Sequence, residues 1–165
     1  MPHASPEPLF LDFVHPAAGS CTVDQTWGLA RPGTPLPGME LVWGHDQFPD
    51  DLSGRCLLFK LGLTCSIIEF SDEKAGIRFV ITLEITGPHG QSAQRETQIV
   101  RGDAWASPGK GGGFSLTQFY GPLEPLRPGQ LLTLRAYAAT LAGTAVIAPG
   151  DLGSNEFRAE VFHVG

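Results

Sequence analysis

The sequence predicts an all-β protein: an antiparallel β-sandwich of about eight or nine strands. Residues 77–86 alternate without a break between apolar side chains at odd positions and mostly polar ones at even positions, which is typical of a strand with one buried face. No stretch shows a convincing helical period, and 21 Gly and 14 Pro provide turn signals between short runs. Many short strands with one polar face favour two packed sheets.

Two long runs form the predicted centre of the fold. Residues 55–70 are apolar at every odd position from Leu57 to Ile67, and Gly62 near the middle indicates a bulge or a close approach by another backbone. Residues 71–76 form the expected turn into the strand at 77–86, where Glu84 should face outward. Residues 87–90, Gly-Pro-His-Gly, end that strand because they cannot continue a central one.

The second half of the chain adds further strands. Residues 91–101 are polar on both faces, which is typical of a hairpin partner at a sheet edge. We expect a loop at 102–113, a strand at 114–120 and a Pro-rich connection at 121–130 that crosses between sheets. Strands are then expected at 131–141, 144–148 and 155–164. The predicted inward residues of the first and last of these are Leu132, Leu134, Ala136, Ala138, Phe157, Ala159 and Val161.

The first 40 residues differ from the rest because seven prolines interrupt them. We therefore expect an irregular, Pro-rich N-terminal arm, residues 1–40, which packs on the domain or on a partner, and a β-sandwich domain, residues 41–165. Two short apolar pieces in the arm, residues 9–14 and 22–29, could be strands at a sheet edge. Residues 40–43 are a further short strand candidate.

A dozen residues, 126–137, read Leu-Arg-Pro-Gly-Gln-Leu-Leu-Thr-Leu-Arg-Ala-Tyr. This phrase resembles the connection and incoming strand of immunoglobulin-like domains. The paired cysteines and core tryptophan of true immunoglobulin domains are missing from it. An immunoglobulin-like sandwich and a jelly roll therefore both stay open.

Charge and composition limit the classes of partner that the chain is expected to bind. The net charge is −6, from 11 basic and 17 acidic residues, and no basic cluster exists, which argues against nucleic acid and against an anionic membrane surface. No apolar run reaches the roughly 18 residues of a membrane span, so we expect no membrane insertion. No signal peptide is evident, so the expected location is the cytoplasm or an assembled particle. The expected state of Cys21, Cys56 and Cys65 is reduced.

One loop could hold a metal ion. His45, Asp46, Asp50 and Asp51 lie in a polar, acidic loop, and calcium prefers several oxygen ligands from flexible loops. The competing interpretation is a solvated loop with turn-forming aspartates. No other cofactor is predicted, because no phosphate-binding or transition-metal spacing is present.

Aromatic residues outside the regular strands are the other candidate site. Trp27, Trp43 and Trp105 lie in predicted loops or at short strand ends, and either Phe119 or Tyr120 should face outward. An exposed patch containing Trp27, Trp43, Trp105 and Tyr120 would mark a protein or sugar surface. The competing interpretation is that the tryptophans close the ends of the sandwich.

These features favour a non-enzymatic structural or interaction protein that contacts other protein chains as a homo- or hetero-oligomer. It would be a subunit or accessory piece of a larger assembly, such as a virion decoration or adaptor protein. The first alternative is a carbohydrate or small-ligand binding module, assisted by calcium. The second is a small β-barrel enzyme with a hydrophobic cavity.

Overall fold

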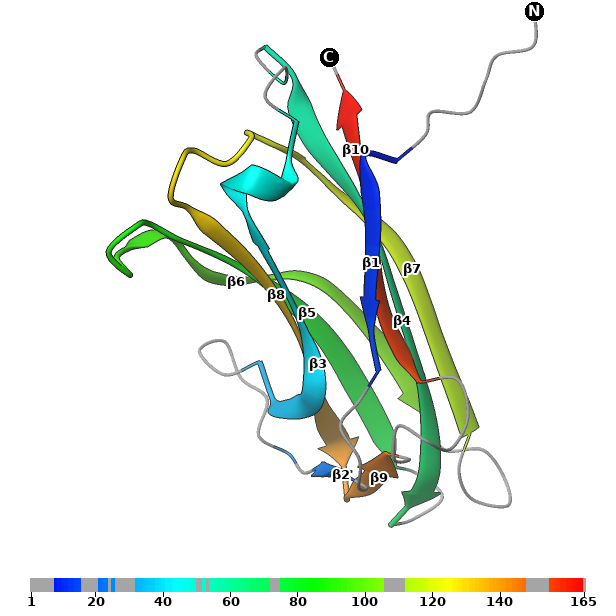
Figure 1. Cartoon of the computed structure of the whole chain (residues 1–165). Coiled ribbons are helices and arrows are strands. Elements are labelled where there is room, and N and C mark those ends of the chain that lie inside the picture. Colours follow the sequence, from blue (N-terminus) through cyan, green and yellow to red (C-terminus); the bar gives the residue numbers. More distant parts are fainter. Residues whose placement is uncertain are drawn as a thin grey trace, which may run out of the picture.

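A computed structural model describes residues 8–15, 21–23, 25, 32–49, 52, 54–71, 75–105, 112–147 and 155–164. Within these residues the chain forms ten strands and one short 3₁₀ helix, η1 (His45–Gln47), and every strand pair is antiparallel (Figure 1). The strands make two separate sheets of six and four strands, so the predicted β-sandwich is confirmed. In chain order the strands are β1 (Phe10–Val14), β2 (Cys21–Val23), β3 (Thr34–Gly44), β4 (Cys56–Phe70), β5 (Gly76–Thr86), β6 (Ser92–Trp105), β7 (Gly112–Leu123), β8 (Leu131–Ala142), β9 (Ala145–Ile147) and β10 (Glu156–Val164).

The six-stranded sheet is built around β4, the longest strand. β7 pairs with one edge of β4. β10 pairs with residues 56–64 of β4 and β9 with residues 67–70, so these two strands lie end to end along its other edge. β1 then pairs with β10, and β2 pairs with β9. Residues 10–14 of the first apolar piece thus form β1 at a sheet edge, as predicted. Residues 22 and 23 of the second piece lie in β2, while residues 24 and 26–29 lie outside the described part.

The four-stranded sheet has the order β3-β8-β5-β6. The polar strand expected at 91–101 is indeed an edge strand, β6, and the connection from β7 to β8 crosses between the sheets as predicted. β3 starts at Thr34, which pairs with Ala138, so the expected boundary at residue 40 falls inside a strand. Pro35 and Pro37 are tolerated there because β3 is an edge strand, and the register shifts between Pro35 and Glu40.

The core lies between the sheets and contains the inward residues predicted for β8 and β10, all of them almost fully buried. Two details differ from expectation. Gly62 marks no bulge, because the register of β4 shifts near its two ends instead, and an added Cβ there would find its nearest atoms 3.9–4.0 Å away. Residues 102–105 and 112–113 were expected in a loop but extend β6 and β7, while residues 106–111 lie outside the described part.

The outer face of the four-stranded sheet is also less exposed than its polar pattern predicted. Val80 and Thr82 of β5 and Thr133 and Tyr137 of β8 are buried, although they alternate with the core residues. Long side chains from neighbouring strands lie over this face, and several of them form the polar network described below. In the described residues there is no helix long and apolar enough to cross a bilayer.

Candidate functional site

The predicted metal loop is only partly described. His45 and Asp46 lie on η1, with Nδ1 of His45 3.6 Å from Oδ1 of Asp46. The Asp46 side chain is fully exposed. Asp50 and Asp51 lie outside the described residues, so the four-residue set stays a prediction. Within the described part of the chain, no three His, Cys, Asp or Glu side chains are grouped as metal ligands.

Trp43 was grouped with the exposed aromatics, but the structure places it in the core with 0% of its surface exposed. Its ring stacks on Phe59 at 6.0 Å between centroids and meets the edge of Phe10 at 5.2 Å. Its indole Nε1 donates a hydrogen bond to Oδ2 of Asp12 at 3.0 Å. Trp43 therefore packs between the sheets. For this residue a structural role, and not membership of an exposed aromatic patch, describes its environment.

The other predicted aromatics have different environments. Trp105 is 62% exposed at the end of β6, and its ring covers Gly76, where an added Cβ would lie 2.6 Å from Cε3. Tyr120 is half-buried and packs against the core, so its neighbour Phe119 is the residue that faces outward, at 61% exposure. Trp27 lies outside the described residues. Of the three predicted aromatics that the structure describes, only Trp105 is strongly exposed.

Sequence reasoning missed the exposed apolar residues of β1. Leu11 and Phe13 face outward, and Phe13 is 50% exposed, while Asp12 between them faces inward to accept the hydrogen bond from Trp43. The strand therefore carries apolar side chains on both faces, because Phe10 and Val14 pack against the core on either side of Asp12. The signal was available in the sequence as the run Phe-Leu-Asp-Phe-Val, but the partner of Asp12, Trp43, lies 31 residues away.

The exposed side chains of Leu11, Phe13 and Phe119 share one face of the six-stranded sheet. Leu11 lies opposite Glu160 of β10, Glu160 opposite Lys60 of β4, and Lys60 opposite Phe119 of β7. Directly paired residues project from the same face of a sheet, so this row crosses four strands with apolar ends and a charged middle. In the middle, Lys60 Nζ lies 3.6 Å from Oε2 of Glu160.

The next row crosses the same face. Phe13 lies opposite Arg158, Arg158 opposite Gly62, and Gly62 opposite Thr117. Gly62 has no side chain, and the ion pair between Arg158 Nη2 and Oε1 of Glu160, at 3.1 Å, lies beside it. We call the surface formed by Leu11, Phe13, Lys60, Phe119, Arg158 and Glu160 the outer apolar face.

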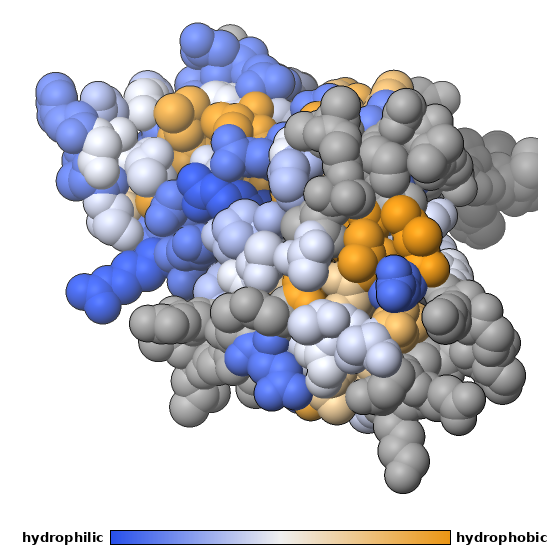
Figure 2. Space-filling view, turned by 90° about the horizontal axis from the view of Figure 1, so that it is seen from below, coloured by the Kyte–Doolittle hydropathy of each residue, from blue (hydrophilic) through white to orange (hydrophobic). Residues whose placement is uncertain are grey.

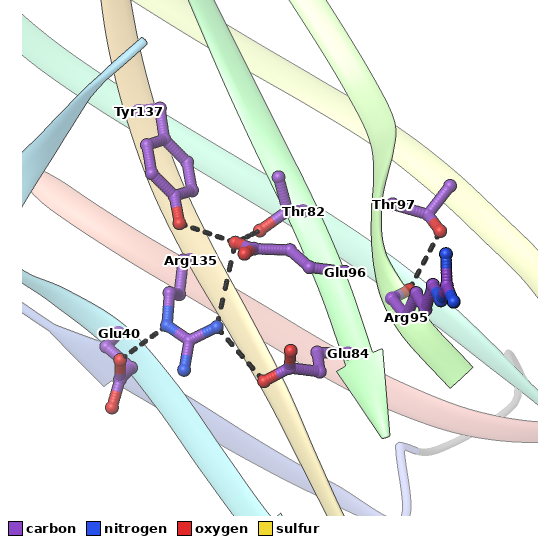
Figure 3. A network of polar contacts seen from close by, with 8 residues as sticks. All are labelled: Glu40, Thr82, Glu84, Arg95, Glu96, Thr97, Arg135 and Tyr137. Atoms are coloured by element: carbon purple, nitrogen blue, oxygen red, sulfur yellow. Dashed lines mark hydrogen bonds and ion pairs between the residues drawn. The ribbon is translucent and has the colours of Figure 1, made fainter. Parts of the chain in front are cut away.

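The opposite sheet carries a polar network instead (Figure 3). The hydroxyl groups of Tyr137 and Thr82 both donate to Oε1 of Glu96, at 2.5 and 2.7 Å. Arg135 joins three glutamates: its Nε donates to Glu40 at 2.9 Å, and its Nη1 lies 3.3 Å from Glu84 and 3.6 Å from Glu96. The network links all four strands β3, β8, β5 and β6.

The surroundings of Glu96 and Tyr137 in this network shift their pKa values in opposite directions. Burial alone would raise the pKa of Glu96, but the hydrogen bonds from Tyr137 and Thr82 and the charge of Arg135 hold that pKa below its ordinary value. Burial, together with the hydrogen bond to Glu96, raises the pKa of Tyr137 to about 12. Both shifts favour a Glu96 carboxylate that accepts a hydrogen bond from a neutral Tyr137 hydroxyl.

The described residues also line open hollows. A cleft of about 500 Å³ lies between β6 and the connection from β7 to β8, lined by Gln94, Leu123, Glu124, Arg127 and neighbours. A groove of about 390 Å³ runs between β6 and β7, beside Val100 and Gln118. At the end of the sandwich where β2 and β9 lie, hydrophobic and hydrophilic residues are mixed on the surface (Figure 2).

No family model matches the sequence, and no curated protein does either. Similar folds exist among solved structures. Two crystal structures of a CocE/NonD family hydrolase from Staphylococcus aureus superpose with TM-scores of 0.51 and 0.53 at 11% and 8% identity. They cover 99% and 98% of this chain but 37% of the hydrolase, so the chain spans little more than a third of that protein.

Two further structures are similar at lower scores. Murine APRIL has a TM-score of 0.47 at 13% identity, covering 91% of this chain and 96% of its own. A structure of infectious bursal disease virus, Gx strain, has a TM-score of 0.42 at 11% identity, covering 93% of this chain and 36% of that one. At these identities the likeness concerns the fold alone.

Proposed function

We propose that this chain is a non-enzymatic β-sandwich module that acts by binding another protein chain through the outer apolar face. It would serve as a subunit or accessory piece of a larger assembly, and a virion decoration or adaptor protein would work in this way. The observation that carries the proposal is the outward face of strand β1, where Leu11 and Phe13 are exposed to solvent while Asp12 between them faces the core.

The apolar surface that β1 leaves in water is available to a partner. Leu11 is 39% and Phe13 50% exposed, so burying the rest of each side chain would contribute about half of the roughly 1.5–3 kcal/mol of a fully buried apolar side chain. Phe119 exposes a third large apolar side chain at the other end of the row that Leu11 begins. In protein interfaces a few large residues supply most of the binding energy, and Leu11, Phe13 and Phe119 are the large apolar side chains that this face offers. The charged groups between them are already ion-paired with one another.

The polar groups on the four-stranded sheet make that sheet a less favourable binding surface than the outer apolar face. Tyr137, Thr82 and Arg135 direct their polar groups to glutamates of the same face, so these groups are already paired within the chain. A partner that docked there would have to replace those interactions, and desolvating the paired charges would cost free energy. The outer apolar face has fewer such groups to desolvate, because Lys60 and Arg158 share the single acceptor Glu160.

The test measures the size of the native complex. The tagged chain is purified gently from the cells that make it, and its mass is measured by size-exclusion chromatography with light scattering. We expect a complex heavier than the 17.6 kDa of one chain, and the double variant Leu11→Ser/Phe13→Ser should lower the mass of this complex by the mass of the chain bound at the outer apolar face. The control Thr97→Ser, on the exposed part of β6, should keep the complex. A native chain that always elutes as a monomer would contradict the proposal.

A further inference from the structure

Strand β7 has one unpaired edge. Its residues pair with β4 from Leu57 to Ile67, and no other strand in the described part of the chain pairs with it. Ser115, Thr117 and Phe119 are all exposed. A strand edge presents backbone N–H and C=O groups that a further strand can pair with.

The structure indicates which residues offer these groups. A Cβ built on Gly62 of β4 would lie 3.9 Å from the carbonyl oxygen of Leu116, so the carbonyl of Leu116 points toward β4. Backbone groups alternate in direction along a strand, and both groups of one residue point to the same side in an antiparallel pair. Ser115, Thr117 and Phe119 therefore direct their N–H and C=O groups to the open edge.

The open edges of β6 and β7 differ in how they are protected against pairing with a further strand. β6 carries charged side chains, among them Arg95, Glu96, Arg101 and Asp103, and its register with β5 shifts three times. Charges and bulges are the usual protection of an edge strand against pairing. The 12 residues of β7 include no charged side chain, and the register with β4 shifts once, near the end of the strand.

We propose that β7 pairs with β7 of a second copy of this chain, antiparallel and centred on Thr117, so that the two six-stranded sheets become one. In this register Thr117 lies opposite Thr117 of the second copy, and Ser115 lies opposite Phe119. The proposal rests on the proposed function and names a second copy as one of the chains that this module binds.

Self-pairing suits this edge because both strands are uncharged. A two-fold interface brings each residue near its own copy, so any charge at its centre would meet a like charge and destabilise the pair. Here the central residue is a threonine, and threonine pairs across neighbouring strands are favourable. The charged residue next to this edge, Lys60 of β4, is already ion-paired with Glu160. Phe119 would also lose much of its exposed surface against the second copy.

The test is sedimentation equilibrium of the purified chain at neutral pH over a wide range of concentrations. We expect a monomer–dimer equilibrium. Thr117→Pro removes an N–H from the open edge while leaving the pairing with β4 intact, and it should weaken association at least tenfold. Thr117→Lys and Thr117→Glu should each be monomeric, and mixing them should restore a dimer of twice the chain mass, because the opposed charges then attract. Thr97→Lys on β6 is the matched control and should dimerise as the native chain does.

Two results would overturn the proposal. One is a native chain that stays monomeric at every concentration, and the other is a dimer that all three Thr117 variants leave unchanged. Thermal unfolding of each variant checks that it is folded. These results are separable from the proposed function: a chain that is monomeric when pure but part of a larger complex in its cells would refute the β7 pairing and leave the outer apolar face as the binding surface.

Discussion

Replacing Trp43 by alanine should be among the most destabilising single changes in the protein. Burying a tryptophan removes about 150–250 Å² from water, which at roughly 25 cal/mol per Å² contributes about 4–6 kcal/mol. Measured costs of Trp→Ala in cores are about 3–5 kcal/mol. The change also removes the hydrogen bond from Nε1 to Asp12 and the stacking on Phe59. For a domain of this size it should lower Tm by about 6–20 °C.

Trp105→Ala is the matched control, because the same side chain is 62% exposed there. It should cost less than about 1 kcal/mol. Both variants are compared with the native chain by denaturant unfolding followed by far-UV circular dichroism, which does not depend on tryptophan emission. Equal losses for the two variants, or a loss below about 1 kcal/mol at Trp43, would refute the placement of Trp43 between the sheets.

Four further outcomes follow from the polar network and the backbone. Tyr137→Phe removes one hydrogen bond to a charged acceptor and should cost about 1.5–3 kcal/mol in denaturant unfolding; no measurable loss would contradict the network. Because the pKa of Glu96 is lowered in the folded state, stability should fall as the pH drops below roughly 4–5, the ordinary range of a glutamate. A Tm that does not change over this pH range would contradict the lowered pKa of Glu96. Because the pKa of Tyr137 is raised to about 12, stability should also fall as the pH rises above about 10, and Tyr137→Phe should lose this alkaline decline. Gly33→Ala places a Cβ 2.6 Å from the carbonyl oxygen of Ala138 at φ +124° and should destabilise the fold by more than about 1 kcal/mol. The control Gly113→Ala, whose Cβ would have no atom within 4 Å, should be tolerated. Equal Tm values for the two variants would count against the close approach of Gly33 to Ala138.

Much of the fold could be predicted because its central strands carry local patterns. β4, β5, β8 and β10 carry apolar residues at alternate positions along much of their length, and Gly and Pro mark most of the turns between them. The apolar face of each strand then determines which residues enter the core. Phe157, Ala159 and Val161 were predicted as inward residues on this ground, and all three are fully buried.

The candidate site was harder to predict because its residues depend on contacts distant in sequence. Asp12 faces inward beside Phe10 and Val14, where it accepts a hydrogen bond from Trp43, and Leu11 and Phe13 then face outward. Thr82 lies on the face predicted to be outward but is buried, and it donates a hydrogen bond to Glu96 of the neighbouring strand. Local periodicity carries no information about either contact, so the exposed face was assigned to the tryptophans instead.

The central claim, that the chain works by contact through its outer apolar face, is tested most directly by site-specific photo-cross-linking in the cells that make it. A photoreactive phenylalanine analogue replaces Phe13 in one variant and Thr97, on the other sheet, in a second. Adducts are identified by mass spectrometry. We predict a defined protein adduct from position 13 and none from position 97. No adduct from position 13, or the same adducts from both positions, would contradict the claim.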